Sequence, residues 1–465
     1  MNVKRSIKVR FAPSPTGQLH IGGVRAALFN WLFARHNNGS FVVRVEDTDL
    51  ERSTKAYSEV IVDALAWLGM KSDEPLVYQS SLVDRHKAYI EKLIVEGKAY
   101  KCYCSLDDIK KRAGEDSPYD KHCRTHLPLD SNKSYVVRFR IPDDDKDEIT
   151  FEDLILGKIT ISLNELDDFI IARSDGSPIY NLVVVVDDAT MGITHVIRGQ
   201  EHVNNTPKQL LLYEALGLDA PRFAHVPLVL GASGAKLSKR DAATSVLDYK
   251  KEGYLPEALI NYLVRLGWSY GNQELFTVDE LIQYFTLNGV GKSSATFDMN
   301  KLRWVNSEHI KKKSGKWILD YLVSQLNPQF LKDLSHWSEV QIIVCIDLYK
   351  ERVSTLKELE NNLKRFYKSP SLYNEEAVEK WVNASSRDLL NSLVLLLSPL
   401  NKWDLEHLQA TIKNFVKNND IKLASVAQPI RIALTGDVVS PGIFHLLSIL
   451  GKEESLKRLE ALVKE

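Results

Sequence analysis

The chain has 465 residues, of which 44% are hydrophobic and 26% charged, a composition typical of a globular protein with about three domains. Its 60 basic and 61 acidic side chains give a net charge of −1, which excludes nucleic-acid binding through overall charge and leaves only local basic patches. Its apolar runs, such as 182–186 and 393–397, are far shorter than the roughly 20 residues that span a bilayer. We therefore expect no membrane association.

The four cysteines are too few and too clustered for a disulfide framework, since three of them lie between Cys102 and Cys123. No apolar signal region follows the lysine and arginine near the N-terminus. These two features predict a cytoplasmic protein in a reducing compartment.

The N-terminal part of the chain alternates between strand and helix. Residues 7–11 alternate like a strand, 24–35 have helical spacing, and Asn37-Asn-Gly39 is expected to end this helix with the glycine in a left-handed cap. Residues 41–45 then predict a buried strand with Glu46 at its carboxyl end, and helical spacing returns over 60–68. Such a βαβ pattern predicts a parallel sheet that binds ligands at the carboxyl ends of its strands.

The pattern changes between about 100 and 169, where cysteines, an acidic loop and short alternating segments indicate a small mixed insertion. Strand–helix alternation is expected to resume at 182–186, 196–198 and 226–230, and after about 248 the sequence is helical almost throughout. We predict an α/β fold: a Rossmann-like parallel-sheet domain with a mixed α/β insertion, followed by an all-α C-terminal half.

The segment Gln18-Leu-His-Ile-Gly-Gly23 lies where the first predicted strand gives way to the first helix. A helix N-terminus carries unpaired N–H groups and partial positive charge, and so favours phosphate. Gly22 and Gly23 would let a ligand lie against the backbone, and His20 could donate a hydrogen bond to a phosphate oxygen. By itself the segment is equally compatible with a glycine-rich surface turn.

A second basic segment, Gly231-Ala-Ser-Gly-Ala-Lys-Leu-Ser-Lys-Arg240, follows a predicted strand and carries three cations in its last five residues. Its small residues would let Lys236 and Lys239 reach a polyphosphate, where cations stabilise the charge that develops during phosphoryl or nucleotidyl transfer. A solvated basic turn is the commoner explanation for such a run taken alone.

The two segments together, in this order across a split α/β pattern, resemble the paired signatures of class I aminoacyl-tRNA synthetases. Further motifs are similar to the bacterial glutamyl-tRNA synthetases, so that the resemblance covers essentially the whole chain. These motifs are Arg10-Phe-Ala-Pro-Ser-Pro-Thr-Gly17, Arg44-Val-Glu-Asp-Thr-Asp49, Val186-Asp-Asp188, His195-Val-Ile-Arg-Gly-Gln-Glu201, Asn205-Thr-Pro207, Tyr262-Leu-Val-Arg-Leu-Gly-Trp268 and the tail 433–441.

The resemblance implies a ligase that activates L-glutamate with ATP and Mg²⁺ and transfers it from the adenylate to the 3′ end of tRNA. Whether such an enzyme would charge only tRNA(Glu) or also tRNA(Gln) stays open, and the family default is a monomer. The nearest enzymatic alternative, a glutaminyl-tRNA synthetase, carries a β-barrel anticodon module, whereas the sequence of this C-terminal half predicts helices. A small-molecule nucleotidyltransferase would have no use for that half.

The resemblance also implies the site residues. Glutamate would contact Arg10, Ala12, Ser14, Glu46, Tyr180 and Arg198. ATP would contact His20, Gly22, Glu201, Lys236 and Lys239, of which His20 and the two lysines would be catalytic.

The chemistry of these residues fits glutamate. Guanidinium groups bind carboxylates bidentately, so Arg10 suits the side-chain carboxylate and Arg198 the α-carboxylate, although the reverse assignment stays open. Glu46 suits the ammonium group. Ordinary surface ion pairs are the alternative explanation for each residue taken singly.

The resemblance gives domains at 1–100 and 181–248 (two halves of the catalytic domain), 101–180 (acceptor-binding insertion), 249–319 (helical stem-contact domain) and 320–465 (helical anticodon-binding domain). Basic residues cluster where the helical half begins, and they would either contact tRNA phosphates or form a solvated face. The cluster consists of Lys301, Arg303, Lys311, Lys312, Lys313 and Lys316.

The insertion contains a candidate structural zinc site. Cys102, Cys104 and Cys123 offer three thiolates, and zinc prefers four tetrahedral ligands. Ligand chemistry alone favours His126 or His122 as the fourth, whereas zinc-bearing members of the family carry a tyrosine where Tyr119 stands. The fourth ligand is therefore left open, as is simple packing of free thiols.

Overall fold

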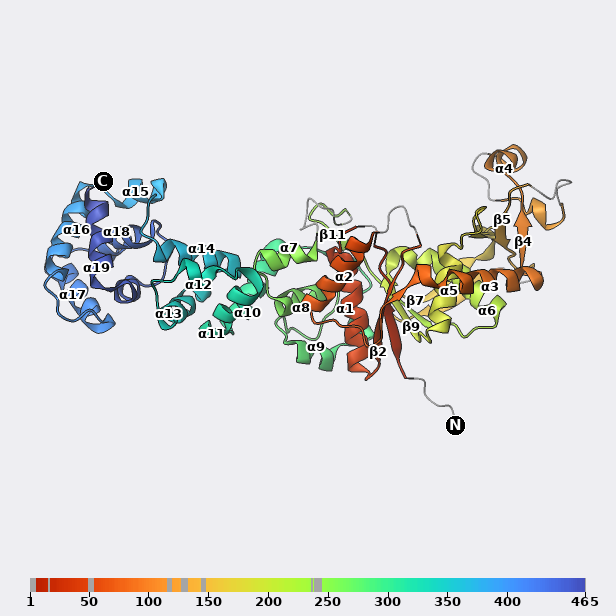
Figure 1. The fold of residues 1–465 in the computed structure, drawn as a ribbon, viewed down its shortest axis with the longest axis horizontal. Helices are drawn as coiled ribbons and strands as arrows, with labels where there is room; N and C mark the ends of the chain where they lie inside the picture. Colours follow the sequence, from red (N-terminus) through yellow and green to blue (C-terminus); the bar gives the residue numbers. More distant parts are fainter. Residues whose placement is uncertain are drawn as a thin grey trace. The chain divides into compact units, whose positions relative to one another are not determined.

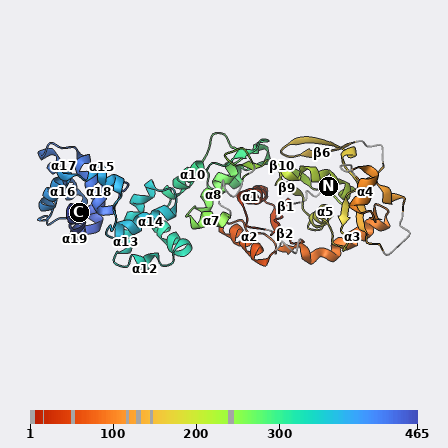
Figure 2. The same ribbon diagram turned by 90° about the horizontal axis from the view of Figure 1, so that it is seen from above.

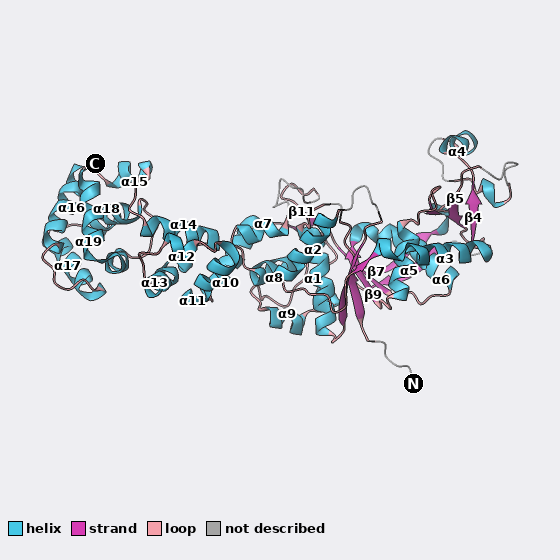
Figure 3. Cartoon of the chain, viewed as in Figure 1, coloured by secondary structure: helices cyan, strands magenta, loops and turns pink. Residues whose placement is uncertain are grey.

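The computed structural model describes residues 6–15, 17–48, 54–114, 119–126, 133–143, 148–235, 237 and 245–464. These residues form two compact units, Met1–Asp248 with Leu259–Met299 and Tyr249–Ala258 with Asn300–Glu465. The first unit is built around a β-sheet with helices, and the second is helical (Figures 1 and 3). The predicted α/β fold with an all-α C-terminal half is therefore confirmed.

A seven-stranded sheet forms the centre of the first unit, in the order β3-β2-β1-β9-β10-β6-β7. All neighbouring strands are parallel except β6 and β7, which form an antiparallel hairpin. The strand order reverses between β1 and β9, and in such sheets the crevice at the reversal is where ligands bind. The strands are β1 (Lys8–Phe11), β2 (Ser40–Val45), β3 (Val77–Tyr78), β6 (Glu148–Asp153), β7 (Gly157–Ser162), β9 (His195–Gly199) and β10 (Arg222–Val226).

Helices cover both faces of this sheet. Helix α1 lies on one face, and α3, α5 and α6 lie on the other (Figures 1 and 2). The core between them consists of aliphatic side chains such as Val9, Val42, Leu182, Val185 and Val196, each at most 1% exposed. The helices of this part are α1 (Ile21–His36), α2 (Lys55–Trp67), α3 (Val83–Val95), α5 (Tyr180–Thr190) and α6 (Thr206–Leu216), with η1 (Gln79–Leu82) and η4 (Gln200–Asn205).

The segment 182–186, which we expected to resume the strands, belongs instead to helix α5. Leu182 and its four valine neighbours are all at most 2% exposed, so the segment is buried on every side of the helix. A short apolar run of this kind cannot be distinguished as strand or helix by its periodicity. Burial overrides the preference of valine for strands.

The end of α1 also differs from expectation. The left-handed backbone conformation is taken by Asn38, with φ 52°, rather than by Gly39. Gly39 is needed for another reason, because a Cβ at this position would overlap the carbonyl oxygen of Ile7. That carbonyl accepts a hydrogen bond from the Ser40 amide at 2.8 Å, where β1 and β2 begin to pair.

The predicted insertion contributes to two sheets. One is a separate antiparallel sheet in the order β4-β5-β8, and the other is the central sheet, which receives the β6–β7 hairpin. The further elements are β4 (Ala99–Cys102), α4 (Leu106–Ala113), η2 (His122–Arg124), β5 (Val136–Phe139), η3 (Leu163–Glu165) and β8 (Ile170–Ala172).

The remainder of the first unit consists of a two-stranded parallel sheet and short helices. Helices α7 and α8 each belong in part to both units. The elements are β11 (Val229–Leu230), α7 (Val246–Lys251), α8 (Pro256–Arg265), α9 (Val278–Tyr284), η5 (Leu287–Gly289) and β12 (Ala295–Thr296).

From Asn300 to Lys464, every element of the second unit is helical. Leucines such as Leu356, Leu359, Leu393 and Leu447 are fully buried between these helices. The helices are α10 (Met299–Lys311), α11 (Gly315–Tyr321), α12 (Phe330–Asp333), α13 (Glu339–Tyr349), α14 (Leu356–Tyr367), α15 (Glu375–Trp381), α16 (Ala384–Leu397), α17 (Leu405–Asn418), α18 (Leu423–Thr435) and α19 (Ile443–Lys464), with η6 (Leu322–Leu326) and η7 (Lys350–Arg352). Within the part of the chain that the structure describes, no helix combines the length and apolarity needed to cross a membrane.

Candidate active site

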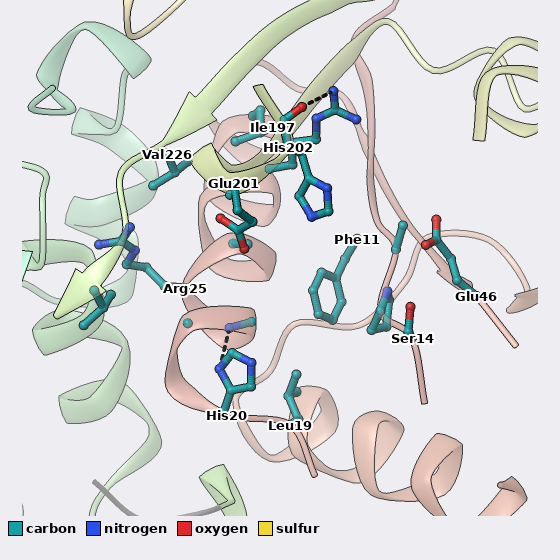
Figure 4. Close-up of a pocket in the computed structure, with 18 of the residues that line it drawn as sticks. Phe11, Ser14, Leu19, His20, Arg25, Glu46, Ile197, Glu201, His202 and Val226 are labelled. Atoms are coloured by element: carbon teal, nitrogen blue, oxygen red, sulfur yellow. Dashed lines mark hydrogen bonds between the residues drawn. The ribbon is translucent and has the colours of Figure 1, made fainter. Parts of the chain in front are cut away.

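A pocket of about 590 Å³ opens at the carboxyl ends of β1 and β9, where the strand order reverses (Figure 4). All nine described residues that the sequence analysis assigns to glutamate or ATP line this one pocket. They are Arg10, Ala12, Ser14, His20, Gly22, Glu46, Tyr180, Arg198 and Glu201. Lys236 and Lys239 lie outside the described residues, although Leu237 between them also lines the pocket.

His20 is the N-cap residue of α1. Its Nδ1 accepts a hydrogen bond from the Gly23 amide at 3.4 Å, and its carbonyl accepts one from the Val24 amide at 3.0 Å (Figure 4). A neutral imidazole that accepts at Nδ1 carries its proton on Nε2. His20 can therefore donate this proton to an anion beside the positive end of α1.

Two glycines of the pocket wall lie close to polar side chains. A Cβ on Gly22 would lie 3.2 Å from the His20 Cε1 atom, tighter than most real contacts. A Cβ on Gly199, at the end of β9, would overlap the Glu201 carboxylate, which also faces the pocket (Figure 4). Glycine at these positions keeps the pocket wall thin, so that a ligand can approach the backbone.

Arg10 reaches the pocket from β1 and is anchored from behind. Its Nε donates to both carboxylate oxygens of Asp188, at 3.1 and 3.2 Å, and both side chains are at most 4% exposed. Among the described residues, its two Nη groups have no hydrogen-bond partner in the structure. Arg10 therefore presents two donor groups from a fixed position.

Arg198 is 6% exposed and has only neutral partners among the described residues. Its Nε bonds to His225 at 3.0 Å and its Nη1 to Gln209 at 2.9 Å, while Nη2 bonds to Thr206 at 2.8 Å. Burial lowers the pKa of Arg198 from its ordinary value. A buried guanidinium without a paired carboxylate favours an anionic ligand, which would supply the absent countercharge.

Glu46 follows β2 directly and lines the same pocket. Burial raises the pKa of Glu46, although the attraction of Arg44 and Arg10 opposes this shift. Its Oε1 lies 3.3 Å from Arg44 Nη2, and its side chain is 10% exposed. Arg10, Arg198 and Glu46 are two cations and one anion, the complement of a ligand with two carboxylates and one ammonium, while Arg25 and Glu201 also line the pocket.

A buried ionic network behind the pocket was not found from the sequence. Fully buried Arg44 donates to Asp188 at 2.6 Å and lies 3.7 Å from Asp187, which in turn bonds to His86 at 2.7 Å. Burial would raise the pKa of Asp188, but Arg10 and Arg44 lower it below its ordinary value. Arg44, Asp187 and Asp188 lie in motifs quoted from the sequence, but nothing in those motifs pairs them with one another.

The three cysteines of the insertion lie together. The Sγ atoms of Cys102, Cys104 and Cys123 are all within 4.8 Å of one another. The Tyr119 hydroxyl lies 3.3 Å from Cys102 Sγ and accepts a hydrogen bond from the Cys123 amide at 2.9 Å. Neither His122 nor His126 joins the cluster; their rings stack on each other at 4.4 Å. Three thiols and a phenol oxygen at these spacings fit a tetrahedral zinc ion.

The basic cluster at the start of the second unit is largely paired with acidic side chains. Arg303 pairs with Glu358, and Lys311 pairs with Glu308 at 2.6 Å. Lys313 and Lys316 also have acidic partners. These ion pairs reduce the positive charge that this face offers to a nucleic acid.

The chain matches two protein families. Residues 6–304 match the catalytic domain of class I tRNA synthetases (E and Q), and residues 316–463 match an anticodon-binding domain. Curated glutamate–tRNA ligases from Thermodesulfovibrio yellowstonii and Geobacter sulfurreducens are 45% and 44% identical to it, with 98% of this chain and 99% and 98% of theirs covered. The crystal structure of a glutamate–tRNA ligase from Elizabethkingia meningosepticum with its amino acid is similar at a TM-score of 0.87 and 34% identity, over 99% of both chains.

Proposed function

The chain belongs to the glutamate–tRNA ligase family of class I tRNA synthetases, and from this premise we propose that it activates L-glutamate with ATP and attaches it to the 3′ end of tRNA(Glu). The observation that carries the proposal is the charge of the pocket. Arg10 and Arg198 would each bind one carboxylate of glutamate, and Glu46 would bind its ammonium group. Glutamine would present a neutral amide to the two Nη groups of Arg10, in place of a carboxylate that can accept from both, and would be rejected for that reason.

The reaction has two steps. The α-carboxylate of glutamate attacks the α-phosphorus of ATP, and pyrophosphate leaves with the electrons of the broken P–O bond. The terminal ribose hydroxyl of tRNA then attacks the adenylate carbonyl; the bond between the carbonyl carbon and the phosphate oxygen breaks, and AMP and the hydroxyl proton are released. No protein nucleophile takes part, so the residues act by position and charge.

The ATP side of the pocket would stabilise the phosphates. His20 would donate from Nε2 to a phosphate oxygen, beside the positive end of α1. Gly22 and Glu201 would lie against the nucleotide, and Lys236 and Lys239 would neutralise charge that develops on the leaving pyrophosphate. Mg²⁺ would accompany ATP and be held chiefly by its phosphates.

We further propose that Cys102, Cys104, Cys123 and Tyr119 hold one structural Zn²⁺. The metal would crosslink β4 to η2 in a cysteine-bearing lobe, whose small core consists of Cys102, Ile109, Tyr119 and Cys123. The purified protein should contain about one zinc per chain, and Tyr119→Phe should lose it to a chelator faster than the parent does. A zinc content far below one per chain would count against this site.

We expect each part of the chain to have the role that the corresponding domain has in the family. The insertion at 101–180 would receive the tRNA acceptor end, 249–319 would contact the stem, and 320–465 would read the anticodon, which agrees with the anticodon-binding match over 316–463. The enzyme would work as a monomer in the cytoplasm.

Pyrophosphate exchange is the test of the activity. We expect exchange with glutamate and not with glutamine, and greater exchange when tRNA is present. Exchange with glutamine alone would overturn the proposal. A separate charging assay with purified tRNA(Glu) and tRNA(Gln) would show whether the enzyme attaches glutamate to tRNA(Gln) as well. Lys239→Ala should reduce adenylate formation, with Lys251→Ala, a change at an exposed lysine outside the basic segment, as the control. An undiminished rate in Lys239→Ala would remove the basic segment from the mechanism.

A further inference from the structure

Three buried side chains form a continuous hydrogen-bonded chain across neighbouring strands of the central sheet. Asp153 Oδ2 lies 2.6 Å from His225 Nδ1, and His225 Nε2 lies 3.0 Å from Arg198 Nε. The three side chains come from β6, β10 and β9 and are 4%, 0% and 6% exposed. His225 and Arg198 are directly paired in the register of β10 and β9, so that their side chains lie on the same face.

The proton positions in this chain follow from its chemistry. The Nε of a guanidinium only donates, so His225 Nε2 must accept from Arg198, and the imidazole proton must be on Nδ1. That proton is donated to Asp153, whose carboxylate selects the tautomer. Burial lowers the pKa of His225, although Asp153 opposes this shift, and the ring stays neutral.

Asp153 is itself held firmly. Its Oδ1 accepts hydrogen bonds from the amides of Ile155 and Leu156 at 2.9 and 2.8 Å, in the turn between β6 and β7. Its Oδ2 also accepts from the backbone amide of His225 at 3.1 Å. The carboxylate therefore has a single orientation, set by the hairpin turn and by β10.

The remaining bonds of Arg198 leave part of its guanidinium for a ligand. Nη1 has one partner, Gln209, and so retains one N–H without a partner among the described residues. His225 holds the opposite edge of the guanidinium plane at Nε. Gln209, Thr206 and the His202 carbonyl hold Nη1 and Nη2, so loss of the Nε bond would remove one of four anchors and loosen the orientation of the plane.

We propose that His225 and Asp153 are positioning residues for substrate binding, which hold Arg198 in the orientation that receives the α-carboxylate of the amino acid. This inference rests on the proposed function, since it assigns the ligand of Arg198. It makes the amino-acid site depend on the β6–β7 hairpin, which the sequence analysis placed in the insertion.

The test separates glutamate binding from the rest of the reaction. His225→Leu removes the hydrogen bonds to Asp153 and Arg198, together with a weaker one to Thr206 at 3.3 Å, and should raise the KM for glutamate about tenfold to a hundredfold, the cost of one misplaced charged hydrogen bond. The KM for ATP should stay within twofold. In His225→Gln the amide oxygen can accept from Arg198 and the amide N–H can donate to Asp153, so the KM for glutamate should recover most of the way.

Asp153→Asn provides a second variant in case His225→Leu does not fold. An asparagine can donate to His225 Nδ1 and thereby favour the wrong tautomer, so the KM for glutamate should again rise. Asp168→Asn is the matched control, because Asp168 is fully buried in the same stretch of chain but bonds to Arg124 and Tyr100 rather than to the His225 chain. Its KM for glutamate should match that of the parent.

Thermal unfolding of each variant accompanies the kinetics. The inference is overturned if the parent enzyme activates glutamate but His225→Leu or Asp153→Asn keeps the parental KM for glutamate. It is equally overturned if all variants, Asp168→Asn included, change the KM values for glutamate and ATP together. A parent enzyme with no glutamate-dependent exchange would instead overturn the proposed function.

Discussion

Asp188 and Glu46 are both buried carboxylates beside arginines, yet their protonation is shifted in opposite directions. Asp188 has two close guanidinium partners, and its pKa is lowered. Glu46 has one more distant partner, and burial raises its pKa. The negative charge of Asp188 is therefore balanced by arginines of the protein itself. The negative charge of Glu46 is balanced less completely, so that a cationic group of a ligand could neutralise it.

Asp188→Asn should destabilise the fold by about 3–5 kcal/mol at pH 7, because it leaves two buried guanidinium groups without their shared countercharge. Urea unfolding of the variant and of exposed Asp63→Asn provides the comparison. The folded-state pKa of Asp188 is below its ordinary value of 3.8, so its contribution is present above that value and disappears as the pH falls through the folded-state pKa. The stability difference between parent and variant should therefore shrink in acid, and a pH-independent difference would contradict this account.

Glu46→Gln should have the opposite effect on stability. Its folded-state pKa is raised, so at neutral pH the ionised carboxylate opposes folding, and its removal should increase the free energy of unfolding by about 0.5–2 kcal/mol. The same variant should raise the KM for glutamate at least tenfold, since the ammonium group loses its anion. Denaturant unfolding and steady-state kinetics on one preparation would check both; a variant that is less stable than the parent would refute the first part.

Sequence reasoning found the residues that face the pocket but not those that hold them. Arg10, Glu46 and Arg198 were identifiable because they lie in motifs with a family resemblance. Their supports, Asp188 and His225, come from strands and helices far away in the chain, at separations of 178 and 27 residues from their arginines. Nothing in a single sequence pairs such residues before the register of the sheet is known.

The junction between α1 and β2 is an element whose geometry depends on one small residue. Gly39→Ala should destabilise the fold by about 1–3 kcal/mol, because the added Cβ would overlap the Ile7 carbonyl and force β1 and β2 apart. Gly291→Ala is the control, since its Cβ would meet its nearest neighbour at 3.7 Å, an ordinary contact. Thermal unfolding measures both, and equal stabilities of the two variants would show that the junction can relax.

At the scale of elements, the first predicted strand and helix were found as predicted, whereas the short apolar run at 182–186 was not. The strand at 7–11 and the helix at 24–35 correspond to β1 and α1, although Val9, Arg10 and Phe11 are all buried and α1 is buried around most of its circumference. The valines of helix α5 are buried on all sides of the helix. The spacing of apolar residues in this run therefore does not distinguish a strand from a helix. The β6–β7 hairpin lay within a segment of changed composition, which gave no indication that it would pair with β10.

At the scale of the whole molecule, the chain passes between its two units more than once. Residues 249–258 belong to the second unit, 259–299 return to the first, and the second resumes at 300. Asn306 joins the two pieces of the second unit: its Oδ1 accepts from the Leu255 amide at 2.9 Å, and its Nδ2 donates to the Ser354 carbonyl at 2.6 Å. This fully buried side chain thus ties together three segments.

Asn306→Ala should destabilise the second unit by about 2–4 kcal/mol, because it leaves a buried amide and a buried carbonyl without partners. Hydrogen exchange read by peptide should become faster across 249–258 and the neighbouring helices of that unit. Exposed Asn414→Ala serves as the control and should exchange like the parent. Unchanged protection at 249–258 in Asn306→Ala would mean that other contacts suffice to hold this segment.

The β6–β7 hairpin limits how far the catalytic unit could be trimmed. Its removal would turn β10 into an open sheet edge, which invites pairing with other chains, and would strip His225 of its carboxylate partner. The cysteine-bearing lobe beyond β4, in contrast, has a small core of its own around Ile109 and Tyr119. A trimmed first unit that still folds and holds Arg198 would therefore lack the lobe and keep the hairpin, although both lie in the stretch of changed sequence composition.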